Sequence, residues 1–201
     1  MSDIRFPAHP TLAGAVWPEQ ASAGPRLARA ALLALVGSAV MALAAKMEVP
    51  FYPVPLTMGS LAVLLIGAAF GARLAAATMV LYLVEGALGL PVFSGTPAHG
   101  IGLPYLLGPT GGYLVGYVAA AYLVGFLAER GADRSIPQLL GAMILGHVVL
   151  FVPGYIWLAH LIGTEAAWTA GVMPFVLGTV VKTLLGALLV PSVWNLVGKR
   201  R

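Results

Sequence analysis

Long apolar tracts, separated by glycine, proline or charged residues, run through the chain from residue 26 onward. Each tract holds about 15 to 25 residues, the length that crosses a hydrocarbon core of about 30 Å. The pattern predicts an all-α, polytopic membrane protein with six transmembrane helices. The predicted helices cover residues 27–45, 56–70, 72–90, 112–129, 137–161 and 173–197.

Composition supports a lipid environment, because 60% of the 201 residues are hydrophobic and 9% are charged, against roughly 25% charged in soluble domains. We expect a mobile cytoplasmic tail over residues 1–25, which has no apolar signal-peptide core, and one membrane domain over residues 26–201. The basic residues are scattered singly at tract ends, which argues against nucleic acid as a partner. The absence of cysteine excludes disulfides and thiolate metal sites.

The distribution of lysine and arginine predicts the orientation, because cytoplasmic loops carry an excess of these residues. If both termini are cytoplasmic, nine of the 11 basic residues lie inside, Lys46 lies outside and Lys182 lies within a span. The nine are Arg5, Arg26, Arg29, Arg73, Arg130, Arg134, Lys199, Arg200 and Arg201.

Two segments on the predicted outer side are irregular and contain no charged residue. They are 89–113 (GLPVFSGTPAHGIGLPYLLGPTGGY) and 49–59 (VPFYPVPLTMG). Irregular backbone at membrane depth is tolerated where it is buried in protein or lines a cavity. We therefore expect both segments to cap a pocket, although interfacial loops anchored by aromatic residues are the alternative. The expected lid residues are Tyr52, Pro53, Pro55, Gly111 and Gly112.

Lys182 and Glu85 are charged residues within predicted spans, and both belong to the outer half of the bundle. Such residues are costly in lipid and mark a ligand, an ion path or a buried partner. An ion pair between them that ties two helices is the alternative to a ligand site. Thr179 and Tyr82 each lie three residues before one of the two, so each pair is expected to share a helical face.

The first predicted helix carries a small residue at every fourth position, at Ala30, Ala34, Ser38 and Ala42. Such a stripe permits close approach of another helix. Internal packing and docking of a separate membrane subunit are equally consistent with it.

Several enzymatic interpretations fail. GPTGG at 108–112 lacks the lysine and spacing of a P-loop, so we do not expect this chain to hydrolyse ATP. Ser94 lies in FSG without a complete nucleophile elbow, which leaves an intramembrane serine hydrolase as a weak alternative. His147 is expected to be a structural histidine at another depth, and no His–carboxylate cluster has metal-ligand spacing. We expect neither metal nor cofactor.

Four stretches in order, VPFYPVPLTMG, LYLVEGALGLPVFSG, GPTGGYLVGY and PFVLGTVVK, resemble the BioY family. These proteins are biotin-specific substrate-binding membrane subunits (S components) of energy-coupling factor (ECF) transporters. The resemblance implies high-affinity biotin capture and uptake across a bacterial cytoplasmic membrane. It also implies that the partners are a transmembrane coupling subunit and two ATP-binding subunits.

The resemblance implies the roles of the site residues. We expect Lys182 to donate to the ureido oxygen or the carboxylate of biotin, Glu85 and Thr179 to bond the ureido N–H groups, and Tyr82, Phe93 and Tyr113 to pack against its rings. This chain has Thr179 where the family has an acidic residue, and Gly59 where glutamine is common.

Ala30, Ala34 and Ser38 would form the docking face for the coupling subunit. A proton-coupled transporter of a vitamin-like solute, with Glu85 and Lys182 as the relay, is the other alternative function.

Overall fold

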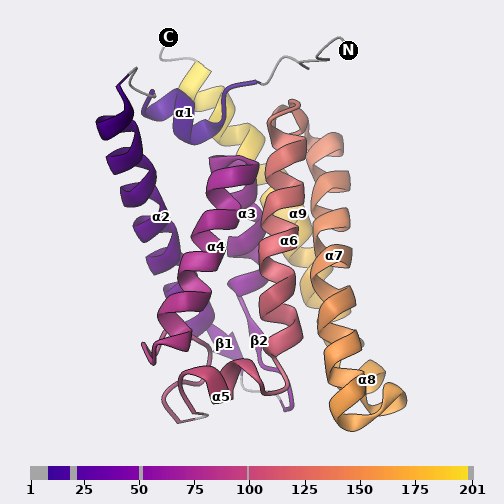
Figure 1. Ribbon diagram of the computed structural model, residues 1–201. Coiled ribbons are helices and arrows are strands. Elements are labelled where there is room, and N and C mark those ends of the chain that lie inside the picture. The colour runs from indigo at the N-terminus through magenta and orange to yellow at the C-terminus, as the bar shows by residue number, and fades with distance from the viewer. Residues whose placement is uncertain (1–8, 19–21, 50–51, 99, 199–201) are drawn as a thin grey trace, which may run out of the picture.

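The computed structural model describes residues 9–18, 22–49, 52–98 and 100–198, which form a bundle of helices aligned along one axis (Figure 1). Its main helices are α2 (Ala23–Lys46), α3 (Gly59–Phe70), α4 (Ala72–Ala87), α6 (Gly111–Ala128), α7 (Ile136–Ile162) and α9 (Phe175–Gly198). The shorter elements are α1 (Leu12–Val16), α5 (Leu103–Leu106), η1 (Ala132–Arg134) and α8 (Thr164–Gly171), and the strands β1 (Glu48–Val49) and β2 (Leu56–Thr57).

The bundle has two different ends (Figure 1). α1, η1 and the last turns of α9 lie at one end, which we call the terminal end. β1, β2, α5 and α8 lie at the other, which we call the ribbon end after its two paired strands. The irregular segments predicted to cap a pocket are therefore gathered at the ribbon end.

Each of the six predicted tracts contains a helix, but the helices differ in length. Within the described residues, α2, α6, α7 and α9 are long and apolar enough to cross a membrane. α3 is a shorter apolar helix of 12 residues, and α4 has 16 residues and ends at Ala87 instead of residue 90. The structure thus shows a mostly helical membrane fold with four candidate spans, and six complete spans stay a prediction.

The start of the second predicted helix is wrong by three residues. Leu56 and Thr57 form β2, which pairs antiparallel with Glu48 and Val49 of β1. The prolines of this segment have no N–H to continue a helical ladder, and α3 begins only at Gly59, after β2. Two-residue strands leave no periodic pattern, which is why the sequence indicated only an irregular loop here.

Helix α6 lies at the centre of the packing and contacts its neighbours through glycine. An added Cβ at Gly116 would lie 2.6 Å from the Leu150 carbonyl oxygen of α7. At Gly125 it would lie 2.5 Å from the backbone nitrogen of Ala72 in α4. Small residues of this kind let helix backbones approach closely in membranes, where dispersion contacts replace the hydrophobic effect between helices.

The predicted tail, residues 1–25, contains an element that the sequence did not predict. Leu12 of α1 is buried, and the guanidinium of Arg29 in α2 donates to the carbonyls of Trp17 (2.8 Å) and Ala13 (2.9 Å). The Ala13 carbonyl also accepts the Trp17 N–H, and both carbonyls lie at the C-terminal end of α1, where the helix dipole favours a cation. Arg5, Lys199, Arg200 and Arg201 of the charge count lie outside the described residues.

The small-residue stripe on α2 packs inside the chain. Ala34 and Ser38 are 9% and 1% exposed, Ala30 is partly buried, and the Ser38 hydroxyl donates to the Glu85 carboxylate of α4. The expectation that this stripe forms a free docking face for another subunit does not fit this burial. Internal packing, the alternative, accounts for the stripe.

We predict that Gly116→Ala lowers the thermal unfolding temperature of the detergent-solubilised protein. The new methyl group overlaps the Leu150 carbonyl, and overpacking of this kind costs about 1–3 kcal/mol. Gly141→Ala in α7 is the matched control, because an added Cβ there meets no atom within 4 Å. Equal unfolding temperatures for the two variants would contradict the close packing of α6 on α7.

Candidate functional site

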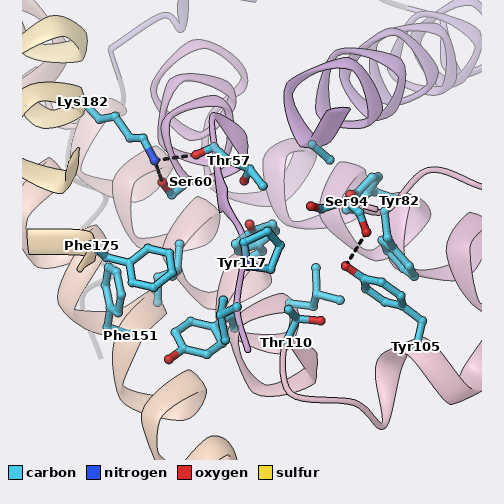
Figure 2. A pocket seen from close by; sticks show the side chains of 17 residues that line it. Thr57, Ser60, Tyr82, Ser94, Tyr105, Thr110, Tyr117, Phe151, Phe175 and Lys182 are labelled. Atoms are coloured by element: carbon cyan, nitrogen blue, oxygen red, sulfur yellow. Dashed lines mark hydrogen bonds between the residues drawn. The ribbon is translucent and has the colours of Figure 1, made fainter. Parts of the chain in front are cut away.

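A cavity lies among the helices at the ribbon end, and we call it the ribbon-end cavity (Figure 2). It encloses about 60 Å³ and is lined by residues from the ribbon, the segment after α4, α5 and the neighbouring ends of the main helices. The lining includes Pro55, Thr57, Ser60, Tyr82, Phe93, Ser94, Tyr105, Thr110, Tyr113, Tyr117, Phe151, Phe175 and Lys182. None of the described lining residues is acidic, so Lys182 gives the cavity a positive end.

The Lys182 ammonium points from α9 toward the ribbon (Figure 2). It donates to the backbone carbonyl of Thr57 in β2 and, at 3.1 Å, to the hydroxyl of Ser60 in α3. An ammonium carries three donors, so these two partners leave one direction for a further acceptor. The cation is therefore held at the cavity wall by neutral oxygens.

An aromatic group forms the opposite side of the cavity. The Phe93 ring meets Tyr82 edge-on, with centroids 5.3 Å apart, and stacks on Tyr105 at 4.9 Å. The Tyr82 hydroxyl donates to the Val92 carbonyl (3.1 Å), and the Tyr105 hydroxyl donates to the Ser94 carbonyl (2.8 Å). Burial raises the pKa of Tyr105 in α5 above its ordinary value of 10.0, so its hydroxyl stays protonated as the donor.

Two tyrosines one helical turn apart on α6 complete the lining. Figure 2 shows Tyr117 between the Lys182 group and the pair formed by Ser94 and Tyr105. Tyr113 is 6% exposed, and its hydroxyl donates to the carbonyl of Gly171 at the end of α8 (2.8 Å). The cavity thus has polar groups at both ends and aromatic faces between them.

Four of the six predicted ligand residues line this cavity, namely Lys182, Tyr82, Phe93 and Tyr113. Thr179 instead lines a separate apolar groove between α7 and α9, together with Ile144, His147 and Val180. Glu85 lies at the interface of α4 with α2, where it accepts the Ser38 hydroxyl. The expected contribution of these two residues to the cavity wall therefore needs correction.

The predicted lid residues divide into two groups. Pro55 lines the cavity, Pro53 is partly buried, and Tyr52 is 88% exposed at the ribbon. Gly111 and Gly112 begin α6, where an added Cβ would lie 1.9 Å from the Leu106 carbonyl oxygen and 2.4 Å from that of Pro153. These two glycines permit close packing of α6 on α5 and α7, which is a different task from covering the cavity.

Several lining residues were missed by the sequence reasoning. Tyr117 follows Tyr113 by four residues, so the helical period alone places both on one face. Thr57 and Ser60 are the polar residues nearest the start of α3, but their approach to Lys182 depends on the ribbon. Phe151 and Phe175 carry no pattern that separates them from lipid-facing aromatic residues.

Among the described residues, the contacts do not form the serine–histidine pair or the Lys182–Glu85 ion pair that the sequence left open as alternatives. The Ser94 hydroxyl donates to the Glu48 carboxylate, whereas His147 Nδ1 lies 3.1 Å from the Met143 carbonyl and from the Thr183 hydroxyl. A serine–histidine pair is thus not formed in the described part of the chain. Lys182 and Glu85 have the separate partners given above, so the ion pair considered from the sequence is not formed there either.

A helical membrane bundle with a lysine-bearing aromatic cavity under irregular caps defines a class of solute-binding membrane proteins. The sequence profile of the BioY family matches residues 17–199. The chain therefore belongs to the BioY family.

Known proteins support this assignment. The chain is 39% identical to the biotin transporter BioY of Rhizobium etli, over 69% of this chain and 77% of the relative. It is 32% identical to biotin transporter BioY2 of Lactococcus lactis, over 76% and 83%. The crystal structure of the S component for biotin from an ECF-type ABC transporter has the same fold, with a TM-score of 0.73 and 21% identity over 87% of this chain and 95% of that chain.

We predict that Tyr113→Phe destabilises the protein by about 1–3 kcal/mol, because it leaves the Gly171 carbonyl without its buried donor. The measurement is the thermal unfolding temperature in detergent. Tyr122→Phe, on the same helix with a 48% exposed side chain, is the control and should be close to neutral. A loss no greater than that of Tyr122→Phe would contradict the role of this hydroxyl.

Proposed function

We propose that this chain is the substrate-binding subunit of an ECF-type biotin transporter and that biotin binds in the ribbon-end cavity. The observation that carries the proposal is the Lys182 ammonium at the wall of an aromatic cavity, in a chain that belongs to the BioY family. A mostly apolar cavity with a few placed polar groups is the usual design for a small ligand.

The chemistry of biotin matches the lining. Its fused rings are apolar and pack against Tyr82, Phe93, Tyr113 and Tyr117, which supply aromatic faces. Its ureido oxygen and its carboxylate are both strong acceptors, and the free direction of the Lys182 ammonium serves one of them. A charge-assisted hydrogen bond in this setting is worth about 1.5–3 kcal/mol.

In this proposal, neutral hydroxyl oxygens of the cavity accept the ureido N–H groups in place of the acidic residue that the family has at the position of Thr179. The two ureido N–H groups need acceptors, and the cavity offers the hydroxyls of Ser60, Ser94 and Thr110. Hydroxyl oxygens accept N–H bonds without the desolvation cost of a carboxylate. Glu85, bonded to Ser38, is not needed for this recognition.

Binding requires the cavity to widen. Its volume of about 60 Å³ holds a few water molecules, whereas ligand sites commonly measure about 300–1,000 Å³. The segments that cover it are loops and a two-residue ribbon, which resist displacement less than packed helices do. We infer that solute enters by displacement of these caps.

The distribution of charge supports an orientation with the ribbon end outside a bacterial cytoplasmic membrane and both termini in the cytoplasm. Arg26, Arg73, Arg130 and Arg134 all lie at helix boundaries of the terminal end, and Lys46 lies at the ribbon end. An excess of arginine on one side is the usual mark of the cytoplasmic face. Biotin would then be captured from the outside.

Uptake in this proposal depends on partners. A transmembrane coupling subunit and two ATP-binding subunits would supply the energy, because this chain carries no P-loop. The coupling subunit would contact a face other than the buried side of α2. The outward side of α2 bears Leu32, Leu35 and Val36, each at least 49% exposed, and remains available for lipid or a partner helix.

The proposed function predicts saturable, stoichiometric binding of radiolabelled biotin to the purified chain in detergent, without its partners or ATP. The physical reason is that this chain itself supplies the cation, the aromatic faces and the hydroxyls that the proposal assigns to biotin. Excess unlabelled biotin should compete, and an unrelated carboxylate such as lipoate should compete far less. No detectable biotin binding by the folded chain would overturn the proposal.

Lys182→Met should weaken biotin binding about ten- to a hundredfold, the equivalent of one charge-assisted bond. The measurement is the equilibrium dissociation constant of labelled biotin. Thr179→Val on the same helix is the comparison, because its side chain faces the α7–α9 groove, and its affinity should match the wild type. A large loss for Thr179→Val with no loss for Lys182→Met would move the site to the groove.

A further inference from the structure

Lys46, the last residue of α2, holds a segment that lies far from it in sequence. Its ammonium donates to the backbone carbonyls of Phe93 (2.9 Å) and Thr96 (2.7 Å) and to the Thr96 hydroxyl (2.8 Å). All three donors of the ammonium are thus used on one short stretch. Residues 89–113 contain no acid, lysine or arginine, so the charge that organises this stretch comes from outside it.

Glu48 in β1 holds the same stretch from a position two residues further on. Its carboxylate accepts the Ser94 hydroxyl, and its strand pairs with β2, which carries the Thr57 carbonyl bonded by Lys182. Hydrogen bonds that involve an ionised group are stronger than neutral ones. Two charged residues therefore connect the end of α2 and the ribbon to the segment that covers the cavity.

The held stretch contains the central ring of the cavity wall. Phe93 is 1% exposed, and its ring fills the space over Gly86, where an added Cβ would lie 2.0 Å from the Phe93 ring. Because Lys46 bonds the Phe93 carbonyl itself, the ammonium determines where the backbone of this residue lies, and hence where its ring meets Tyr82 and Tyr105.

We propose that Lys46 and Glu48 are positioning residues for the substrate site. They keep the Phe93–Thr96 stretch closed over the cavity and so set how long the solute stays bound. The inference rests on the proposed function, because it takes biotin as the occupant. Neither residue lines the cavity, so each acts through the stretch that it holds. Loss of the Lys46 bonds should let the stretch open more often.

The test measures the dissociation rate of radiolabelled biotin from the purified chain in detergent, for Lys46→Met and Lys46→Arg. Met keeps the apolar stem but removes the donors, and dissociation should become about tenfold faster. Arg restores a cation with several donors and should return the rate to within about threefold of the wild type. Glu165→Gln, which changes an exposed side chain of α8 at the same end of the bundle, is the control and should dissociate at the wild-type rate.

Lys46 is exposed, so its replacement leaves no void in the core. If Lys46→Met nevertheless fails to fold, Thr96→Val serves in its place, because it keeps the shape of the side chain but removes the hydroxyl that accepts from Lys46 and donates to the Phe93 carbonyl. A wild-type dissociation rate in Lys46→Met or in this substitute would overturn the inference, as would fast dissociation in Lys46→Arg equal to that of Lys46→Met. Failure of the wild-type chain to bind biotin would instead refute the proposed function.

Discussion

The structure depends on one constraint: irregular backbone at the end of a membrane bundle must find hydrogen-bond partners within the protein. At the ribbon end these partners are side chains of helices and short elements that donate to loop, strand or helix-end carbonyls. The donors are Lys46, Lys182, Tyr82, Tyr105, Tyr113 and Trp157. The caps are therefore attached at separate points, each through one side chain of a helix. The ribbon-end cavity lies beneath these caps.

The Lys182 ammonium shows how the same constraint serves recognition. A lysine within a span needs oxygen partners because its charge is costly in lipid, and the ribbon supplies them through the Thr57 carbonyl. A solute that brings its own acceptor to this cation would share or replace those partners. The group that ties the ribbon to α9 and the group proposed to recognise the solute are then one and the same.

The sequence predicted the helices well because hydropathy and length are the strongest signals in a membrane protein. Charge within a span and the helical period brought Lys182 and Tyr82 into one expected site, and the resemblance to the BioY family added Phe93 and Tyr113; all four line the cavity. The prediction failed for residues whose place depends on the rotation of a helix about its own axis. Residues three apart on a helix are about 60° from alignment, so Tyr82 and Lys182 face the cavity while their partners Glu85 and Thr179 turn toward α2 and toward the α7–α9 groove. The β1–β2 ribbon and the Lys46 contacts depend on long-range pairing that no local pattern encodes.

The glycine contacts of α6 have a mechanical consequence. Helix α6 lies against α7 and α4 at Gly112, Gly116 and Gly125, at distances where no methyl group fits. The centre of the bundle is therefore closely packed and has no free volume for a guest molecule. Any volume that a guest molecule needs must come from the periphery, where the ribbon and the loops are tied by individual side chains. The molecule thus divides into a closely packed frame and a cover tied by individual side chains, so a change of volume around a guest falls to the cover.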